Sequence, residues 1–184
     1  MISKQLVAFC LFFTTFFALT PLQAQTKVAQ GTDCTGDCHL VGKFDRRVLE
    51  SNETYASWFL KNYNDYQIDA TILDTLQALS KNNITFKIIM GTWCSDSQRD
   101  VPRFSKILDT LQISSEAITY YALDTNKQSA EKIEETYNVR FVPTFIILEN
   151  GVERNRIVEM SIQTLEADLL NILTSNTYKH VYAE

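Results

Sequence analysis

Apolar residues are spaced in two ways along this chain, one typical of strands and the other typical of helices. The run 84–90 is rich in β-branched and aromatic residues and has the length of a buried strand. The segment that follows residue 94 carries its apolar residues at helical spacing, namely Val101, Phe104, Ile107, Leu108 and Leu111. Pro102 lies among them and, because it lacks a backbone donor, is expected to kink this helix.

The alternation of strand and helix patterns continues toward the C-terminus. We expect a second strand at 118–123, a short helix at about 129–137, a third strand at 144–148 and a fourth at 156–158. Asn150-Gly151 is a strong hairpin signal, so the last two strands should pair antiparallel. A strand, helix, strand unit of this length implies a right-handed parallel crossover between the first two strands.

Helical cover is expected on both sides of these strands in the sequence. Segment 44–83 has aromatic residues at helical spacing and, after the polar break Asn64-Asp65, a second apolar series: Tyr55, Trp58, Phe59 and Tyr63, then Ile68, Ile72, Leu76 and Leu79. The aromatic stripe could line a ligand groove, but we favour core packing. A last helix, capped by Ser161, should face inward with Ile162, Leu165, Leu169 and Ile172.

The N-terminal region has the pattern of a secretory signal peptide. Lys4 precedes an apolar stretch at 6–19, and the small residue Ala24 follows it. As a helix this stretch would span about 21 Å, short of the roughly 30 Å hydrocarbon core of a bilayer. We therefore expect removal of residues 1–24 and export to a periplasmic or extracellular compartment, with no membrane span left in the mature protein. An N-terminal extension, 25–83, would then precede a core domain at 84–176.

Charge and composition narrow the classes of function. The mature chain, 25–184, has a length that suits one domain, and 45% of the whole sequence is hydrophobic and 21% charged. The net charge of −5 becomes −6 when Lys4, the single charged residue of 1–24, is removed. No basic surface for nucleic acid is therefore indicated. No pattern in the sequence indicates a cofactor.

Three cysteines remain after Cys10 leaves with the signal: Cys34, Cys38 and Cys94. An odd number leaves at least one thiol unpaired or paired with a partner. Cys34 and Cys38 lie in a polar segment without periodicity, and a local disulfide between them is the interpretation that we favour. Three alternatives stay open: a resolving role toward Cys94, a metal site that includes His39, and haem attachment, for which the spacing is one residue too long.

Cys94 lies at the turn from the 84–90 strand to the following helix. Unpaired backbone N–H groups and the positive end of the helix dipole both favour a thiolate at such a position. The turn therefore suits a nucleophile. The alternative is that Cys94 is a small buried hydrophobe, as free cysteines often are.

The segment 93–97 reads Trp-Cys-Ser-Asp-Ser, and Pro102 lies five residues after it. Further on, 138–151 includes Val142-Pro143-Thr144, a strand and the Asn-Gly turn. In order and spacing, residues 84–174 resemble thioredoxins, with Ser97 in place of the second cysteine of the Trp-Cys-x-x-Cys signature and Pro143 in place of the cis-proline. The resemblance implies an α/β, thioredoxin-like fold, a central mixed sheet flanked by helices, here with an N-terminal helical extension.

Departures from the family pattern limit the chemistry that the resemblance implies. Ile88 stands where thioredoxins bury an aspartate, and Tyr120 lies near the place of their buried lysine. Ser97 cannot resolve a mixed disulfide, because an alkoxide is inaccessible at neutral pH and a serine oxygen forms no stable bond to sulfur there. Dithiol reduction within this motif alone is therefore excluded.

The chemistry that remains is monothiol thiol–disulfide exchange, as a possible oxidoreductase or isomerase. Cys94 would attack an exposed disulfide, Trp93 would shield the site, and Val142 and Thr144 beside Pro143 would receive an extended substrate. Disulfide- or thiol-bearing exported proteins, or small thiols, would be the partners. A second thiol from the substrate, a small molecule or Cys34/Cys38 would release the mixed disulfide. The alternatives are a non-catalytic binding module and a redox sensor in which Cys34 or Cys38 captures an oxidised Cys94.

The sequence predicts that Cys34 and Cys38 are disulfide-bonded in the exported protein. They are close in sequence and lie in an oxidising compartment, although so short a loop can strain the bond and make it reducible. Peptide mapping without reduction should recover one cross-linked fragment. Alkylation of both thiols in the same unreduced molecule would contradict the pairing.

Overall fold

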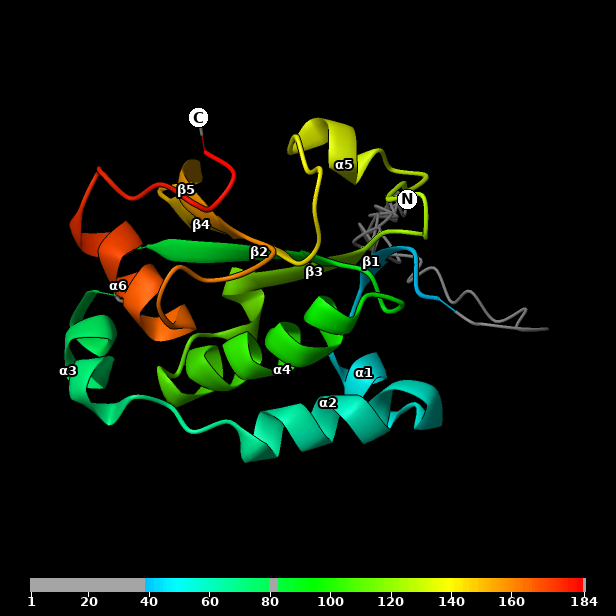
Figure 1. Cartoon of the computed structure of the whole chain (residues 1–184), viewed down its shortest axis with the longest axis horizontal. Coiled ribbons are helices and arrows are strands. Elements are labelled where there is room, and N and C mark those ends of the chain that lie inside the picture. The colour runs from blue at the N-terminus through cyan, green and yellow to red at the C-terminus, as the bar shows by residue number, and fades with distance from the viewer. Residues whose placement is uncertain (1–38, 80–82, 184) are drawn as a thin grey trace, which may run out of the picture.

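A five-stranded mixed sheet forms the centre of the computed structural model, which describes residues 39–79 and 83–183 (Figure 1). Its strands are β1 (Gly42–Phe44), β2 (Ile84–Met90), β3 (Ile118–Ala122), β4 (Thr144–Glu149) and β5 (Val152–Val158), arranged in the order β1-β3-β2-β4-β5. β2 runs parallel to β3, and the other neighbouring strands are antiparallel. The parallel pair and the β4–β5 hairpin confirm the pairings expected from the sequence.

Helices cover the two faces of the sheet unequally. They are α1 (Arg47–Ser51), α2 (Glu53–Asp65), α3 (Ala70–Leu79), α4 (Ser95–Thr110), α5 (Ile133–Thr136) and α6 (Leu165–Thr174), with a 3-10 turn at Ser115–Ala117. In Figure 1 α5 alone lies above the sheet, and the other helices lie below it. No helix of residues 39–79 and 83–183 is long and apolar enough to cross a membrane.

Two apolar clusters form the core, one on each face of the sheet. The larger cluster joins the sheet to α2, α4 and α6, and in it the Phe104 ring contacts Phe86 and Phe145 at centroid distances of 6.0 and 4.5 Å. The smaller cluster, on the α5 face, includes Ile89 and Val142. Trp93 and Cys94 are partly buried and pack against this smaller cluster, which helps to position them.

The aromatic stripe of α2 serves core packing, as favoured from the sequence. Tyr55 and Phe59 are buried, and Trp58 and Tyr63 pack partly buried against the same cluster. The inward series of α4 is also confirmed, because Val101, Phe104, Ile107, Leu108 and Leu111 are all buried. These two faces meet, since α2 packs directly on α4.

The short strand β1 corrects the expectation that residues 44–83 are helical throughout. Phe44 belongs to β1 and lies opposite Tyr120 of β3 in an antiparallel pair. A strand of three residues is too short to show the alternation that identifies strands in a sequence. β1 is ordered by its pairing with β3, which lies more than seventy residues further along the chain.

The last two helices also differ from expectation at their N-termini. Thr164, not Ser161, caps α6, with its side chain accepting a hydrogen bond from Ala167 N at 3.1 Å. Ile162, expected to face inward, is 54% exposed, because the buried Asp168 carboxylate accepts the Ile162 N–H and holds this segment as a loop. α5 is shorter than 129–137 and starts only after Lys132, which has a left-handed backbone conformation.

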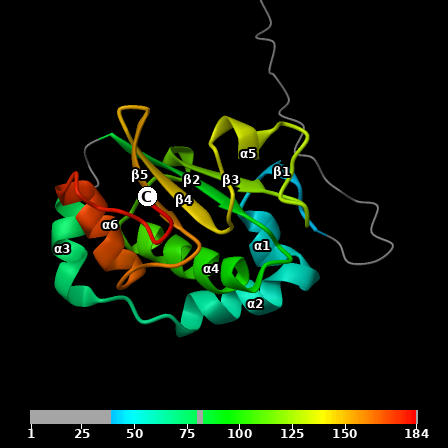
Figure 2. The same ribbon diagram turned by 45° about the horizontal axis from the view of Figure 1, so that its top comes forward.

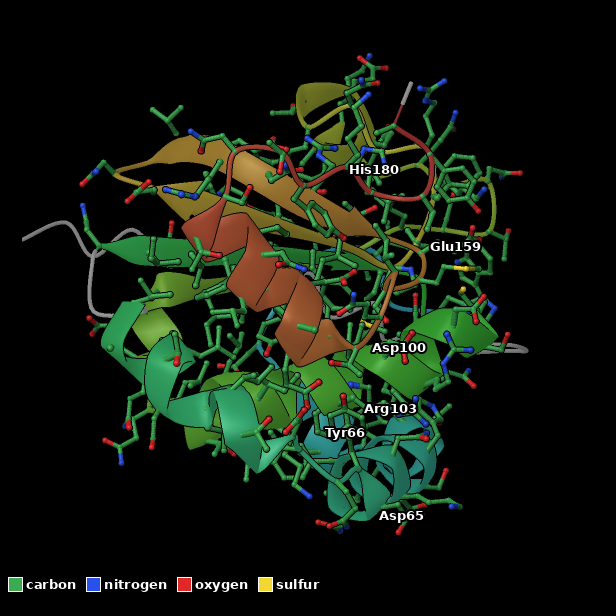
Figure 3. The ribbon with its side chains drawn as sticks, turned by 60° about the vertical axis from the view of Figure 1, so that its left-hand side comes forward. Asp65, Tyr66, Asp100, Arg103, Glu159 and His180 are labelled. Atoms are coloured by element: carbon green, nitrogen blue, oxygen red, sulfur yellow. The ribbon has the colours of Figure 1, made fainter. Side chains whose placement is uncertain are left out.

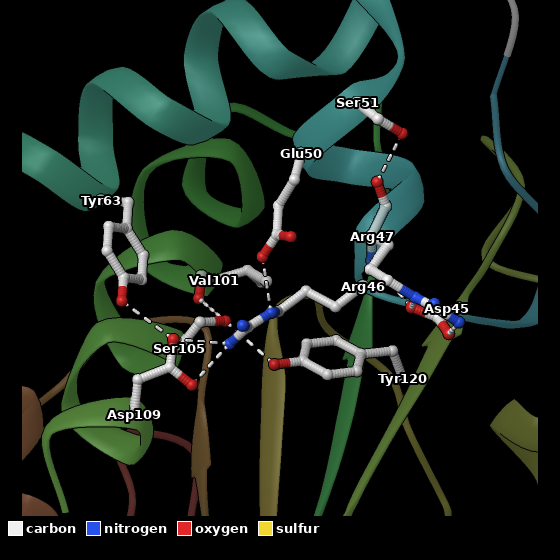
Figure 4. A network of polar contacts seen from close by, with 10 residues as sticks. All are labelled: Asp45, Arg46, Arg47, Glu50, Ser51, Tyr63, Val101, Ser105, Asp109 and Tyr120. Atoms are coloured by element: carbon white, nitrogen blue, oxygen red, sulfur yellow. Dashed lines mark hydrogen bonds and ion pairs between the residues drawn. The ribbon is translucent and has the colours of Figure 1, made fainter. Parts of the chain in front are cut away.

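A charged network ties the N-terminal helices to α4 (Figure 4). The Arg46 guanidinium donates two hydrogen bonds of 2.8 Å to the Asp109 carboxylate and pairs with Glu50. The Tyr63 hydroxyl donates to the same carboxylate at 2.9 Å. Burial together with this carboxylate raises the pKa of Tyr63 to about 12. Asp109 therefore joins three elements through partly buried, charge-assisted bonds.

We predict that Asp109→Asn lowers the free energy of unfolding by about 2 kcal/mol, because hydrogen bonds to charged, partly buried groups are worth more than neutral ones. Asp65→Asn is the matched control, since Asp65 forms an ion pair with Lys61 in which both side chains are largely exposed. That change should cost less than about 0.5 kcal/mol. Urea unfolding of both variants measures the difference, and equal losses would show that the network adds nothing to an ordinary surface pair.

Candidate functional site

Cys94 lies where β2 passes into α4. Its backbone N–H closes a turn to Gly91 O at 3.0 Å, and its carbonyl accepts the N–H of Gln98 at 2.9 Å, so it is the N-cap residue of α4. The Cys94 side chain is partly exposed, and its thiol is free. The strand-to-helix position expected from the sequence is confirmed.

The peptide bond between Val142 and Pro143 is cis and lies against the Cys94 thiol. Cys94 Sγ donates a hydrogen bond to Val142 O at 3.3 Å. On the other side, Pro143 O accepts the Glu159 N–H at 2.7 Å, which ties the loop to the end of β5. The cis geometry inferred from the resemblance is therefore present, with Cys94 and Pro143 in one site.

Thr144 is brought to this loop, but its side chain faces inward. It is buried, and its hydroxyl donates to Phe141 O at 2.7 Å across the cis peptide. Val142 is also buried, with only 2% of its surface exposed. Thr144 thus shapes the loop from within, whereas Val142 presents its carbonyl to the thiol.

Trp93 is fixed beside Cys94 by a hydrogen bond and a close glycine contact. Its indole Nε1–H donates to Leu123 O at 3.0 Å. A Cβ atom placed on Gly91 would lie 2.6 Å from Cε2 of the indole, so only glycine leaves room for the ring. Sequence reasoning missed this role of Gly91, which depends on how the turn folds back on itself.

Ser97 lies one helical turn after Cys94 on the inner side of α4. It is fully buried, and its hydroxyl oxygen accepts the Gly91 N–H at 3.2 Å. This bond satisfies a backbone donor in the turn that leads to Cys94. The structure therefore gives Ser97 a supporting role, in a position that faces the turn before Cys94.

Thr92 links the site to the N-terminal segment. The Thr92 side-chain oxygen accepts the Leu40 N–H at 3.1 Å and lies 3.5 Å from His39 Nδ1. Gln98 Nε2 donates to the Thr92 carbonyl at 2.7 Å. Residues 39–40 thus contact Thr92, which lies two positions before Cys94 in the sequence. No sequence pattern indicates this contact. Cys34 and Cys38 lie outside the described residues.

The charges near Cys94 are paired within α4. Asp96 forms an ion pair of 2.6 Å with Arg99, and Arg99 also binds the buried Asp100 at 2.7 Å. These bonds to Asp100 and Asp96 raise the pKa of the Arg99 guanidinium. The negative charge of Asp96, which would oppose a thiolate on Cys94, is therefore partly offset by a fixed cation.

Two positions that carry ionisable groups in thioredoxins are filled differently here. Ile88 is fully buried in β2, and Tyr120 is buried with its hydroxyl 3.0 Å from Ser105 Oγ. Within residues 39–79 and 83–183, no group of three or more His, Cys, Asp or Glu side chains could hold a metal ion. Cys94 is the cysteine that the structure describes at this site.

The comparisons with known proteins agree with this geometry. A family model described as thioredoxin matches residues 42–167. Thioredoxin from Malassezia sympodialis is 30% identical over 77 residues, which cover 42% of this chain and 70% of that protein. Thioredoxin from Mycoplasma genitalium is 28% identical over 81 residues, which cover 44% of this chain and 74% of that protein.

A solved structure is also similar in fold. It is a crystal structure of a protein of unknown function from Pseudomonas aeruginosa, with a TM-score of 0.55 and 11% sequence identity. The match covers 72% of this chain and 92% of that one. At this identity the similarity concerns the fold alone.

We predict that Gly91→Ala displaces the Trp93 indole and breaks its bond to Leu123 O. The added Cβ would overlap the ring, and overpacking typically costs about 1–3 kcal/mol. The indole N–H resonance of Trp93 should shift and exchange faster with solvent. In a Trp93→Ala background, Gly91→Ala should cost much less, because the overlapping ring is gone. Equal costs in both backgrounds would show that Gly91 does not make room for Trp93.

Proposed function

This chain belongs to the thioredoxin family, and we propose that it performs monothiol thiol–disulfide exchange through Cys94. The observation that carries the proposal is the 3.3 Å contact between Cys94 Sγ and the carbonyl of Val142, whose peptide bond to Pro143 is cis. A thiol held at a helix N-terminus beside this loop is placed to attack a disulfide that docks there. Ser97 limits the chemistry to one thiol.

The first step would be attack of the Cys94 thiolate on one sulfur of a substrate disulfide. An Sγ–S bond forms, the substrate S–S bond breaks, and the departing thiolate takes a proton from solvent. Ionisation of Cys94 removes the S–H donor from Val142 O. That carbonyl can then accept an N–H from an extended substrate, so the loop would bind the substrate as the nucleophile forms.

The second step needs a thiol that Ser97 does not supply. A thiolate from the substrate or from a small molecule attacks the substrate sulfur of the mixed disulfide, forms a new disulfide and releases Cys94 as thiolate. The two steps together exchange partners without net oxidation, which is the chemistry of an isomerase or of a thiol-transfer enzyme. Trp93 shields one side of the mixed disulfide while it waits.

Cys34 and Cys38 are the internal candidates for the second thiol. The bond from Leu40 N to Thr92 Oγ1 holds the chain close to the site only two residues after Cys38. This tether brings residue 40 to Thr92, two positions before Cys94 in the sequence. The same tether supports a second candidate function, a sensor in which hydrogen peroxide oxidises Cys94 to sulfenic acid and Cys34 or Cys38 captures it with loss of water.

We also propose that the protein works outside the cytoplasm. The support is the charged, apolar and small-residue pattern of residues 1–24. Exported proteins with exposed disulfides or thiols, or small thiols, would then be its partners. A role as a binding module without exchange chemistry would leave the Cys94 thiol without a purpose at the cis-proline loop.

We predict that Ser97→Cys converts the site to dithiol chemistry. The new thiol would replace a buried hydroxyl one helical turn from Cys94, where the two sulfurs can meet. It should attack the mixed disulfide internally, raising catalysed reduction of insulin by about a hundredfold or more through effective concentration. Wild type should show little activity in this assay.

Two control variants separate this effect from the mere addition of a thiol. Ser95→Cys makes the same change at an exposed neighbouring position that does not face Cys94, and should leave activity low. Cys94→Ser should abolish exchange and keep the circular dichroism spectrum, because its side chain is partly exposed at a turn. If mild oxidation of Ser97→Cys yields no bond to Cys94, the proposed geometry of the motif is wrong.

A further inference from the structure

The chain continues past α6 as a segment that returns to the Cys94 site. Residues 175–183, named here the C-terminal strap, leave the helical face and cross β5 toward the cis-proline loop (Figure 2). Within it His180, and at the end of β5 Glu159, lie at the same end of the molecule (Figure 3). The strap has no regular secondary structure, so side-chain contacts hold it in place.

The middle of the strap is firmly anchored. The Tyr178 hydroxyl donates to Asp168 Oδ2 at 2.8 Å, and Asp168 is fully buried. Asn155 of β5 donates its side-chain N–H to Tyr178 O at 2.9 Å. Burial and the Asp168 carboxylate raise the pKa of Tyr178, so this hydroxyl stays a donor at every physiological pH. Tyr178 therefore fixes where the strap crosses the sheet.

The end of the strap is held more lightly, by one side chain. The Tyr182 ring stacks on Phe141 with a centroid distance of 4.1 Å and an interplanar angle of 10°, and its hydroxyl bonds to Glu159. The bond to Glu159 raises the pKa of Tyr182, and the charge of Asp96 adds to this shift. Tyr182 thus contacts the loop before Pro143 and the end of β5, within electrostatic reach of the first turn of α4. It is still 39% exposed.

These contacts bracket the backbone that a protein substrate would need. Phe141 directly precedes Val142, and Glu159 donates its N–H to Pro143 O. Val142 itself is buried in the apolar cluster of the α5 face, and the Tyr182 ring lies against Phe141, the residue before it. An extended chain that approached Val142 along Phe141 would meet the Tyr182 ring, whereas the partly exposed Cys94 remains open to a small molecule.

We propose that the C-terminal strap is a lid over the cis-proline side of the site, with Tyr182 as its latch. With the lid closed, small disulfides and thiols reach Cys94. A protein disulfide pairs with Val142 only after Tyr182 leaves Phe141 and the strap moves about its anchor at Tyr178. This substrate selection rests on the proposed exchange function, but the lid itself does not.

His180 makes the lid sensitive to pH. Its Nδ1 accepts the Tyr182 backbone N–H at 3.2 Å, which only an unprotonated Nδ1 can do. The charged groups that act on the ring are Arg156 and Glu153 of β5, and the cationic Arg140 lines the same pocket. Burial, with Arg156, lowers the pKa of His180, against the opposing effect of Glu153. The closed lid binds fewer protons than the open one, so it is stable above the ordinary histidine pKa of about 6.5 and opens as the pH falls below it.

Alkylation of Cys94 by two maleimides of different size tests the lid in the full-length chain. N-ethylmaleimide serves as the small probe and a maleimide on a long polyethylene glycol chain as the large one, with labelling at Cys94 measured by peptide mass spectrometry. Tyr182→Ala should raise the ratio of large-probe to small-probe rates about tenfold, as expected for a site that is mostly closed. Tyr182→Phe keeps the stacked ring but loses the hydroxyl, so its ratio should lie between those of wild type and Tyr182→Ala.

Val181→Ala is the matched control, because Val181 is an exposed neighbour on the same strap, and its ratio should stay within about twofold of wild type. Both probes react with the Cys94 thiolate, so the ratio of their rates does not depend on the fraction of thiolate. A rise of the ratio in wild type at pH about 5.5 therefore reports opening of the lid. His180→Gln should remove that rise. An unchanged ratio in Tyr182→Ala would overturn the lid. A ratio that responds to Tyr182 in a protein whose Cys94 exchanges no disulfide would overturn the proposed function and leave the lid standing.

Discussion

The antiparallel pairing of β2 with β4 is the constraint on which the site depends. Its register places Ile89 opposite Thr144, so the end of β2 and the start of β4 meet at one edge of the sheet. The turn to Cys94 and the loop with Pro143 are the segments that leave this edge. Their contact, from Cys94 Sγ to Val142 O at 3.3 Å, follows from that register. β4 is buried on both faces, so a slip of one residue would exchange the side chains that pack in the two apolar clusters, and the core and the site are fixed together.

A serine at position 97 changes the chemistry without weakening the turn. Its hydroxyl accepts the Gly91 N–H inside the protein, where an unpaired backbone donor would be costly. The Gly91 N–H of the turn is therefore hydrogen-bonded, but the Trp93–Ser97 motif lacks a second thiol. A mixed disulfide on Cys94 has no thiol within the Trp93–Ser97 motif to break it, so its lifetime depends on what can reach it. Under the proposed exchange chemistry, access to Cys94 would set this lifetime, and segments 39–40 and 175–183 contact the residues on either side of the site.

Long periodic elements could be predicted from the sequence, and contacts between distant segments could not. The bounds of β2 and the buried face of α4 follow from local apolar spacing. The motif residues Trp93, Cys94 and Pro143 follow from the family resemblance, which also anticipated the cis peptide. β1 was missed because three residues carry no periodic signal.

The cap of α6 and some contacts of the site could not be predicted for the same reason, because they depend on side chains that meet only in the folded chain. Ser161 is as good a capping residue as Thr164, and the choice between them depends on the buried Asp168, which draws the Ile162 N–H into a loop. The stacking of Tyr182 on Phe141, forty-one positions apart, likewise exists only in the folded chain.

The central claim, that Cys94 is a monothiol nucleophile, is tested most directly with oxidised glutathione and a Cys34→Ser/Cys38→Ser variant. A monothiol nucleophile should form a glutathione adduct on Cys94, detected by peptide mass spectrometry, that persists until a free thiol is added. A Cys94 thiol that stays unmodified in the folded protein would contradict it.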